Sequence, residues 1–166
     1  MADTSSAEPS AAIPSVLIIG ANGFLGRTLP IWIAARHRDC KITLLDISHD
    51  TGLKYDYVKG DITDLSSLVE IFQRVKPTAV IHSASPPIPT VGKGDKILYF
   101  RVNVEGTKNV IKACNESGVK ALVYTSSASV IYNGTDLVNA DEKLPYATRH
   151  VDAYNASKVF FCFGFH

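Results

Sequence analysis

The stretch Val16-Leu17-Ile18-Ile19-Gly20-Ala21-Asn22-Gly23-Phe24-Leu25-Gly26 decides the fold of this chain. Residues 16–19 form a continuous apolar run, which is typical of a strand buried on both faces of a parallel sheet. After Gly23 the apolar residues follow a helical period as far as about His37. The stretch therefore predicts a strand, a tight glycine turn and a helix that begins directly after the turn.

The same alternation of strand and helix continues along the rest of the chain. Pro30 predicts a kink or a lost hydrogen bond in the first helix, and residues 47–54 are too few for a helical crossover, so a loop is expected there. The alternation predicts an α/β fold, a Rossmann-type doubly wound parallel sheet of about five strands with helices on both faces. The further expected strands are 42–45, 55–58, 79–82 and 121–124, and the further expected helices are 65–75, 95–117 and one that begins near 151.

The glycine turn has the spacing Gly-x-x-Gly-x-x-Gly and lies between a buried strand and a helix. Such glycines allow a sharp turn, a close approach of the backbone to a pyrophosphate, and close packing of the helix on the sheet. The free N–H groups at the start of the helix attract phosphate. We therefore expect a dinucleotide to bind at Gly20, Gly23, Phe24, Leu25 and Gly26. The alternative is a helix-capping turn with a packing glycine.

Asp46 ends the second expected strand, 20 residues after Gly26. At this place an acidic side chain accepts hydrogen bonds from the ribose hydroxyls of NAD. A carboxylate there repels the 2′-phosphate of NADP, and no arginine stands near Asp46 in the sequence to receive that phosphate. NAD is thus the expected cofactor and NADP the less favoured one. The alternative is that Asp46 only starts a loop.

Tyr154 and Lys158 are four residues apart on an expected helix and so share one face. A free tyrosine has a pKa of about 10, and a nearby ammonium lowers it toward the range useful for proton transfer. Lys158 could also bind the nicotinamide ribose, and Ser127, with Ser126 as second choice, could hydrogen-bond the reacting oxygen. Asn103 could hold a water or backbone group near Lys158, or be an ordinary helix residue. Together with the turn, the pair indicates hydride transfer between a nicotinamide cofactor and an alcohol or ketone; a solvated surface pair is the alternative.

Composition narrows the class of protein. The 166 residues are 46% hydrophobic and 20% charged with a net charge of +1, which argues against nucleic acid or an anionic membrane surface as the main partner. Three dispersed cysteines indicate reduced thiols and a cytoplasmic protein, and no His/Cys/carboxylate cluster has metal-ligand spacing. No apolar run approaches the roughly 20 residues that span a bilayer. Residues 1–13 are expected to form a disordered leader.

The chain resembles the extended short-chain dehydrogenases/reductases, and within them the 3β-hydroxysteroid dehydrogenase/isomerase family, especially its sterol-4α-carboxylate 3-dehydrogenases. The matching stretches are VLIIGANGFLG, KGDITD, VIHSASPP, RVNVEGTKNVI, LVYTSSASVIYNG and YNASK. The resemblance implies that Asp61 and Ile62 lie at the adenine. It also implies that Ser83, Ala84 and Ser85 lie along the cofactor, and that Ser127, Tyr154 and Lys158 act in catalysis.

The family resemblance implies oxidation of the 3β-hydroxyl of a steroid or sterol-4-carboxylate, frequent dimerisation and, in the full-length form, association with the endoplasmic reticulum surface. Two alternatives stay open: a sugar-nucleotide epimerase/dehydratase or flavonoid-type ketone reductase of the same superfamily, and a non-enzymatic dinucleotide-binding fragment. Residues 14–158 are expected to be an incomplete NAD-binding domain without a substrate domain, and thus inactive alone. The apolar tail 159–166 lacks an amphipathic period and is expected to fit a helix poorly.

Overall fold

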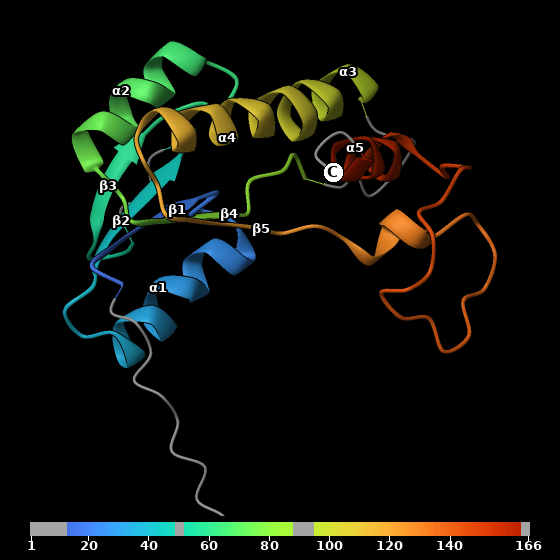
Figure 1. Cartoon of the computed structure of the whole chain (residues 1–166), viewed down its shortest axis with the longest axis horizontal. Helices are drawn as coiled ribbons and strands as arrows, with labels where there is room; N and C mark the ends of the chain where they lie inside the picture. The colour runs from blue at the N-terminus through green and yellow to red at the C-terminus, as the bar shows by residue number, and fades with distance from the viewer. Residues whose placement is uncertain (1–12, 49–51, 88–94, 164–166) are drawn as a thin grey trace, which may run out of the picture.

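The centre of the molecule is a parallel sheet, seen edge-on in Figure 1. The computed structural model describes residues 13–48, 52–87 and 95–163. The strand order is β3-β2-β1-β4-β5, so the order reverses between β1 and β4, as in dinucleotide-binding sheets. The expected α/β fold is confirmed, and every expected strand lies within one residue of its observed bounds. These bounds are β1 Ser15–Ile19, β2 Lys41–Asp46, β3 Asp56–Lys59, β4 Ala79–His82 and β5 Ala121–Tyr124.

Helices cover both faces of the sheet. In Figure 1, α1 lies on one face, α2 and α4 lie on the other, and α5 lies beyond the ends of β4 and β5. Residues 47–48 and 52–55, on either side of a short undescribed segment, form no helix, which agrees with the loop expected there. The helices are α1 Phe24–Arg36, α2 Leu65–Val75, α3 Lys96–Tyr99, η1 Phe100–Gly106, α4 Thr107–Glu116, η2 Ala128–Ile131 and α5 Ala153–Phe163.

Strand β1 contributes to two apolar cores because successive side chains of a strand point to opposite faces of the sheet. Val16 and Ile18 belong to the core on the α1 side. Leu17 and Ile19 belong to the core under α2 and α4, which also contains Phe72. All four β1 side chains are buried, so the continuous apolar run at 16–19 reflects a strand covered on both faces.

The helix expected over 95–117 is present, but it is not one regular α-helix. Residues 100–106 wind as a π-helix, η1, between the short α3 and the longer α4. The apolar spacing does not reveal this winding, because η1 is only seven residues long and lies within a longer helical run. A π-segment often accompanies a functional site, and η1 contacts both α5 and the cavity described below. In α1, by contrast, the helix continues past the buried Pro30.

The expectation that the tail fits a helix poorly is wrong for residues 159–163, which complete the last turn of α5. The physical reason is tertiary contact. Val159 is buried, and the ring centroids of Phe160 and Phe100 lie 5.8 Å apart. Packing on η1 thus stabilises a helical turn that has no amphipathic period of its own. The leader 1–12 and residues 164–166 lie outside the described residues.

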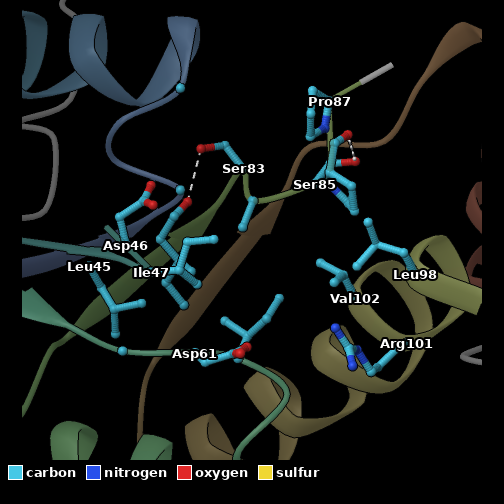
Figure 2. Close-up of a pocket in the computed structure, with 17 residues that line it drawn as sticks. Leu45, Asp46, Ile47, Asp61, Ser83, Ser85, Pro87, Leu98, Arg101 and Val102 are labelled. Carbon is cyan, nitrogen blue, oxygen red and sulfur yellow. Dashed lines mark hydrogen bonds between the residues drawn. The ribbon is translucent and has the colours of Figure 1, made fainter. Parts of the chain in front are cut away.

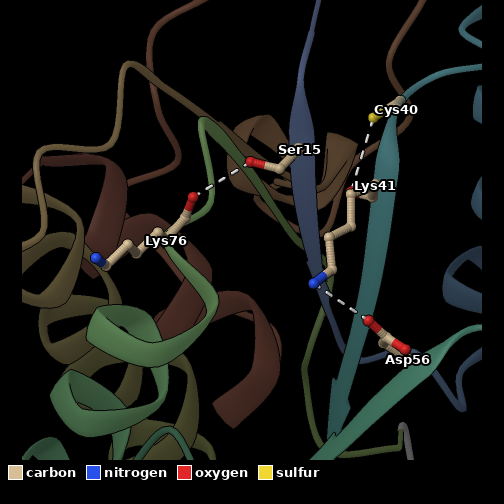
Figure 3. A network of polar contacts seen from close by, with 5 residues as sticks. All are labelled: Ser15, Cys40, Lys41, Asp56 and Lys76. Atoms are coloured by element: carbon tan, nitrogen blue, oxygen red, sulfur yellow. Dashed lines mark hydrogen bonds and ion pairs between the residues drawn. The ribbon is translucent and has the colours of Figure 1, made fainter.

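Polar contacts tie strands together at the edge of the sheet opposite the cavity (Figure 3). The Ser15 hydroxyl donates a hydrogen bond to the Lys76 carbonyl at 3.2 Å. Lys41 of β2 and Asp56 of β3 form an ion pair at 3.5 Å, but both side chains are exposed, so the pair contributes little to stability. In the described parts of the chain, no helix has the length and apolar character that crossing a membrane requires.

Candidate active site

A cavity of about 280 Å³ lies at the carboxyl ends of β1, β2, β3 and β4. Ligands of open parallel sheets bind at this edge, where the strand order reverses. Figure 2 shows residues from four strand ends and from the α3–η1 helical run around it. Most of the expected cofactor-binding residues line its wall, namely Gly20, Gly23, Asp46, Asp61, Ile62, Ser83, Ala84 and Ser85.

The glycines of the turn differ in what surrounds them. Gly20 has a φ of +84°, and a Cβ there would lie 2.5 Å from the Ala84 amide nitrogen. A Cβ on Gly26 would lie 2.1 Å from the Gly20 carbonyl oxygen. A Cβ on Gly23 would meet only that same oxygen, at 3.3 Å. Gly20 and Gly26 are therefore required for packing, whereas Gly23 leaves room along the cavity wall.

The first turn of α1 is the second element, after the glycines, that is predicted to bind phosphate. Gly23 is the N-cap of α1, and no side chain caps the N–H groups that follow it. These N–H groups and the positive end of the helix dipole suit an anion. Phe24 is 94% exposed and Leu25 is also exposed; neither they nor Gly26 line the cavity. The cofactor-binding role expected of these three residues would therefore use their backbone N–H groups and not their side chains.

Asp46 holds the turn as well as lining the cavity. One carboxylate oxygen accepts a hydrogen bond from the Asn22 amide N–H at 2.9 Å, and the other accepts one from the Ser48 N–H at 3.4 Å. The Asn22 side chain in turn donates to the Ser48 carbonyl at 2.8 Å. Asp46 thus has a structural role in the turn, and it also lines the cavity in which the ribose hydroxyls are expected.

Hydrogen bonds, one local and two long-range, hold the residues that follow β3 and β4. Asp61 accepts a hydrogen bond from the Thr63 N–H at 2.8 Å. The Ile62 carbonyl accepts one from the Asn109 side-chain amide at 2.9 Å. The Ser83 hydroxyl donates to the Ile19 carbonyl at 2.9 Å, so it links β4 to β1. These hydrogen bonds connect this wall of the cavity to β1 and to α4.

Sequence reasoning missed the wall contributed by the α3–η1 run. Leu98, Arg101 and Val102 line the cavity opposite Asp61 (Figure 2). Their spacing of i, i+3 and i+4 is the one available signal, because it places them on one helical face. It does not say what the face contacts. The structure thus brings an arginine, distant from Asp46 in the sequence, into the same cavity.

Tyr154 and Lys158 lie together on α5 as expected. The Lys158 ammonium is 5.9 Å from the centroid of the Tyr154 ring, and Lys158 is only 2% exposed. Its Nζ donates hydrogen bonds to the Tyr124 hydroxyl at 3.0 Å and to the Thr125 carbonyl at 3.1 Å. The pair is therefore not a solvated surface pair. Tyr124 was not among the expected site residues, since nothing in its local sequence sets it apart.

Ser127 lies just past β5, at the start of η2, and its hydroxyl is engaged locally. It accepts hydrogen bonds from the Ser129 N–H at 3.2 Å and from the Ser129 hydroxyl at 2.8 Å. Within residues 13–48, 52–87 and 95–163, no hydrogen bond joins Ser127 to Tyr154. The elements that carry the two residues are nevertheless packed together, because η2 contacts α5.

Asn103 is fully buried and joins η1 to α5. Its amide nitrogen donates to the Ser157 hydroxyl at 2.9 Å, and that hydroxyl donates to the Tyr154 carbonyl at 2.7 Å. The Asn103 side-chain oxygen is buried and finds no partner among the described residues. Asn103 therefore contacts the helix next to Lys158 through Ser157, and it does not line the cavity.

His82, at the end of β4, lies near Lys158 and Tyr124. We refer to Tyr154, Lys158, Tyr124, Asn103 and His82 together as the Tyr154–Lys158 corner. His82 is fully buried, and its Nε2 lies 3.0 Å from the Thr107 hydroxyl. Burial, with a smaller contribution from the positive charge of Lys158, lowers the pKa of His82 to about 3. The imidazole is thus neutral near pH 7 and acts as a hydrogen-bonding core residue. Its ring packs at 5.3 Å from that of Tyr124.

Comparisons with known proteins agree with this geometry. The model of the 3-beta hydroxysteroid dehydrogenase/isomerase family matches residues 17–160. A sterol-4-alpha-carboxylate 3-dehydrogenase, decarboxylating, of Schizosaccharomyces pombe is 41% identical over 151 residues, which cover 87% of this chain and 43% of that protein. The human protein of the same name is 39% identical over 143 residues, covering 86% and 36%.

Among solved structures, the UDP-glucose 4-epimerase of Thermus thermophilus in complex with NAD is similar, with a TM-score of 0.77 and 29% identity. The match covers 90% of this chain and 49% of the epimerase. The chain thus spans less than half the length of each of these relatives. Because the family model covers most of its residues, including the turn and the Tyr154–Lys158 pair, the chain belongs to the 3-beta hydroxysteroid dehydrogenase/isomerase family.

Proposed function

We propose that this chain is the NAD-binding part of a dehydrogenase that oxidises the 3β-hydroxyl of a steroid or sterol-4-carboxylate. The observation that carries the proposal is the position of the Tyr154–Lys158 pair. The pair lies on α5, where Lys158 is buried and Tyr154 half-buried, and α5 packs on η1, which also forms one wall of the cavity. The helix that carries the proposed proton-transfer pair and the cavity of about 280 Å³ thus both adjoin η1, although neither Tyr154 nor Lys158 lines the cavity itself.

The residues present fit a dinucleotide. The open side of Gly23 and the uncapped first turn of α1 suit the pyrophosphate, and the Asp46 carboxylate suits the ribose hydroxyls. Asp61 and Ile62 would lie at the adenine, with Ser83, Ala84 and Ser85 along the cofactor. The negative charge of Asp46 supports NAD over NADP. When bound, the nicotinamide would accept a hydride from carbon 3 of the substrate.

The proton from the substrate hydroxyl would pass to Tyr154. Lys158, buried and within 6 Å of the Tyr154 ring, would place a positive charge beside the residue that takes the proton. Ser127 accepts hydrogen bonds from Ser129, and its own O–H would donate to the reacting oxygen. Asn103, through Ser157, would hold the backbone of Tyr154 in register.

The substrate class is supported by the relatives. Both sequence relatives described above are named sterol-4-alpha-carboxylate 3-dehydrogenases. Oxidation of a 3β-hydroxyl next to a 4-carboxylate gives a β-keto acid. Its carbon–carbon bond to the carboxylate breaks readily, since the new ketone holds the electron pair as an enolate until a proton is taken up. No further oxidant is required for that loss of carbon dioxide.

A sugar-nucleotide epimerase or dehydratase is the second candidate, because several matching solved structures are epimerases, the Thermus enzyme among them. The Thermus epimerase is 29% identical to this chain, whereas the two sterol-4-alpha-carboxylate 3-dehydrogenases are 39% and 41% identical, which favours the sterol reaction. A non-enzymatic dinucleotide-binding fragment is the third. On the family resemblance we further propose that the complete protein dimerises and associates with the endoplasmic reticulum surface.

Two measurements test the proposal. Calorimetric titration of residues 1–166 with NADH and NADPH should give tighter binding of NADH. A chimera in which the C-terminal part of the Schizosaccharomyces relative follows Lys158 should oxidise a 3β-hydroxysterol-4-carboxylate and release carbon dioxide. Tighter NADPH binding would reject the cofactor assignment, and a chimera active only on UDP-sugars would support the second candidate instead. A fragment that binds NADH while every chimera stays inactive would leave the non-enzymatic function.

A further inference from the structure

Arg101 is a charged residue in the cavity that the expected set of site residues does not contain. It lies on η1, and its side chain forms the cavity wall together with Leu98 and Val102. In Figure 2 the Arg101 guanidinium and the Asp61 carboxylate lie on opposite sides of the same end of the cavity. This is the end at which Asp61 and Ile62 are expected to meet the adenine.

The guanidinium is available to a ligand. Arg101 makes no hydrogen bond or ion pair with any residue that the structure describes. The nearby carboxylate of Asp61 already accepts the Thr63 N–H, and that of Asp46 accepts the Asn22 and Ser48 N–H groups. A cation thus faces a cavity whose acidic groups are bonded to the backbone.

The surroundings of Arg101 suit a flat, uncharged ring better than a phosphate. Leu98, Val102 and Ile62 supply apolar surface beside it. Ile62 is held in place by the neighbouring helix, because a Cβ on Gly106 would lie 2.7 Å from its side chain. The phosphate-binding features, the open Gly23 and the uncapped α1, are contributed by the β1–α1 turn and not by this wall.

We propose that the planar guanidinium of Arg101 stacks on the adenine ring of the dinucleotide, with Ile62 supplying apolar contact to that ring. Arginine stacks on aromatic faces through its delocalised planar charge, which a lysine does not reproduce. The inference rests on the proposed NAD-binding function and adds a residue that contacts the adenine base. Because the stacking involves the base alone, it applies equally to adenosine, AMP and NADH.

The test compares Arg101→Gln and Arg101→Lys with the parent chain and with Arg74→Gln, a control that removes one charge from an exposed helix position outside the cavity. NADH is titrated directly, and adenosine, AMP and 2′,5′-ADP compete against it. Arg101→Gln should weaken adenosine, AMP and NADH alike, by roughly 3- to 30-fold. Arg101→Lys should recover only a small part of that loss, and Arg74→Gln should change none of the affinities.

A spectroscopic readout separates stacking from a structural effect. Fluorescence of 1,N6-etheno-AMP should be quenched on binding to the parent chain and less so on binding to Arg101→Gln at saturation. Unchanged affinities in Arg101→Gln would overturn the proposal while leaving NAD binding intact. A loss confined to AMP and 2′,5′-ADP, spared for adenosine and restored by Arg101→Lys, would overturn it in favour of a phosphate contact. A parent chain that binds no NADH would reject the proposed function itself.

Discussion

The glycine turn and the Tyr154–Lys158 corner differ in how their geometry is held. In the turn, Gly20, Gly23 and Gly26 are close in sequence and in direct backbone contact. In the corner, Lys158 binds Tyr124 across 34 residues of sequence, and Asn103 binds Ser157 across 54. The contacts among the three glycines are therefore local, although Asp46 also holds the turn from β2, whereas these contacts of the corner join separate helices and strands. Substitutions should affect the two regions in different ways.

The largest effect is expected from Gly26→Ala. Its Cβ would lie 2.1 Å from the Gly20 carbonyl oxygen, a backbone atom that cannot move without shifting β1 or α1. We expect the free energy of unfolding to fall by about 3 kcal/mol or more, measured by urea denaturation. Gly23→Ala is the matched control, because its Cβ meets that oxygen at 3.3 Å. Gly23→Ala should stay folded and lose NADH affinity. An equal loss of stability in both variants would show that Gly26 is no more important for packing than Gly23.

In the corner, Tyr154→Phe should lower kcat of the active chimera by about 10²- to 10⁴-fold, because it removes the proton carrier and keeps the ring. NADH affinity should be unchanged. Tyr99→Phe is a suitable comparison: the Tyr99 ring packs edge-on against Tyr154 at 5.7 Å, and its hydroxyl donates to the Pro87 carbonyl. Rates within a few-fold of the parent for Tyr154→Phe would remove Tyr154 from the catalytic role.

Acid should loosen the corner through His82, whose pKa is lowered to about 3 by burial and by the charge of Lys158. Between pH 6.5 and about 3 the unfolded chain binds a proton at this residue and the folded chain does not. The free energy of unfolding should therefore decrease as the pH falls, by about 2 kcal/mol from pH 7.5 to pH 5.

Denaturation curves across this pH range measure the dependence. His82→Gln, which keeps a hydrogen-bonding group for Thr107 and does not titrate, should flatten it. His150→Gln, at an exposed position, should leave the slope unchanged. A parent slope that survives in His82→Gln would assign the acid sensitivity to other groups.

The smallest effect is expected from substitution of Asp46. Here the hydrogen bond that holds the turn can be separated from the negative charge that is proposed to select NAD. Asp46→Asn keeps an oxygen to accept the Asn22 N–H but removes the charge. We expect the preference for NADH over NADPH to narrow by about tenfold, or about 1.4 kcal/mol, with the stability almost unchanged. Asp46→Ala should lose both preference and stability. Calorimetry with both cofactors, alongside thermal melts, separates the cases; an unaltered preference in Asp46→Asn would mean that its charge does not select the cofactor.

The parts of the fold that could be predicted from the sequence are those with a local physical signal. The buried strand at 16–19, the glycine turn and the helix at 65–75 follow from apolar period and backbone freedom, and all were confirmed. The π-winding of η1 and the helical path of residues 159–163 were not predicted. Both depend on packing between η1 and α5, for which neither segment carries a local pattern.

In the candidate site, too, some features follow from local sequence and others only from tertiary packing. Sequence by itself determined the fold class, the turn and the shared face of Tyr154 and Lys158, because strand period, glycine conformation and helix pitch act over a few residues. Only the tertiary structure decided that Arg101 enters the cavity, that Tyr124 binds Lys158, and that Asn103 reaches α5 through Ser157. Those contacts join segments far apart in the chain, and their positions depend on how helices pack on the sheet rather than on any local preference.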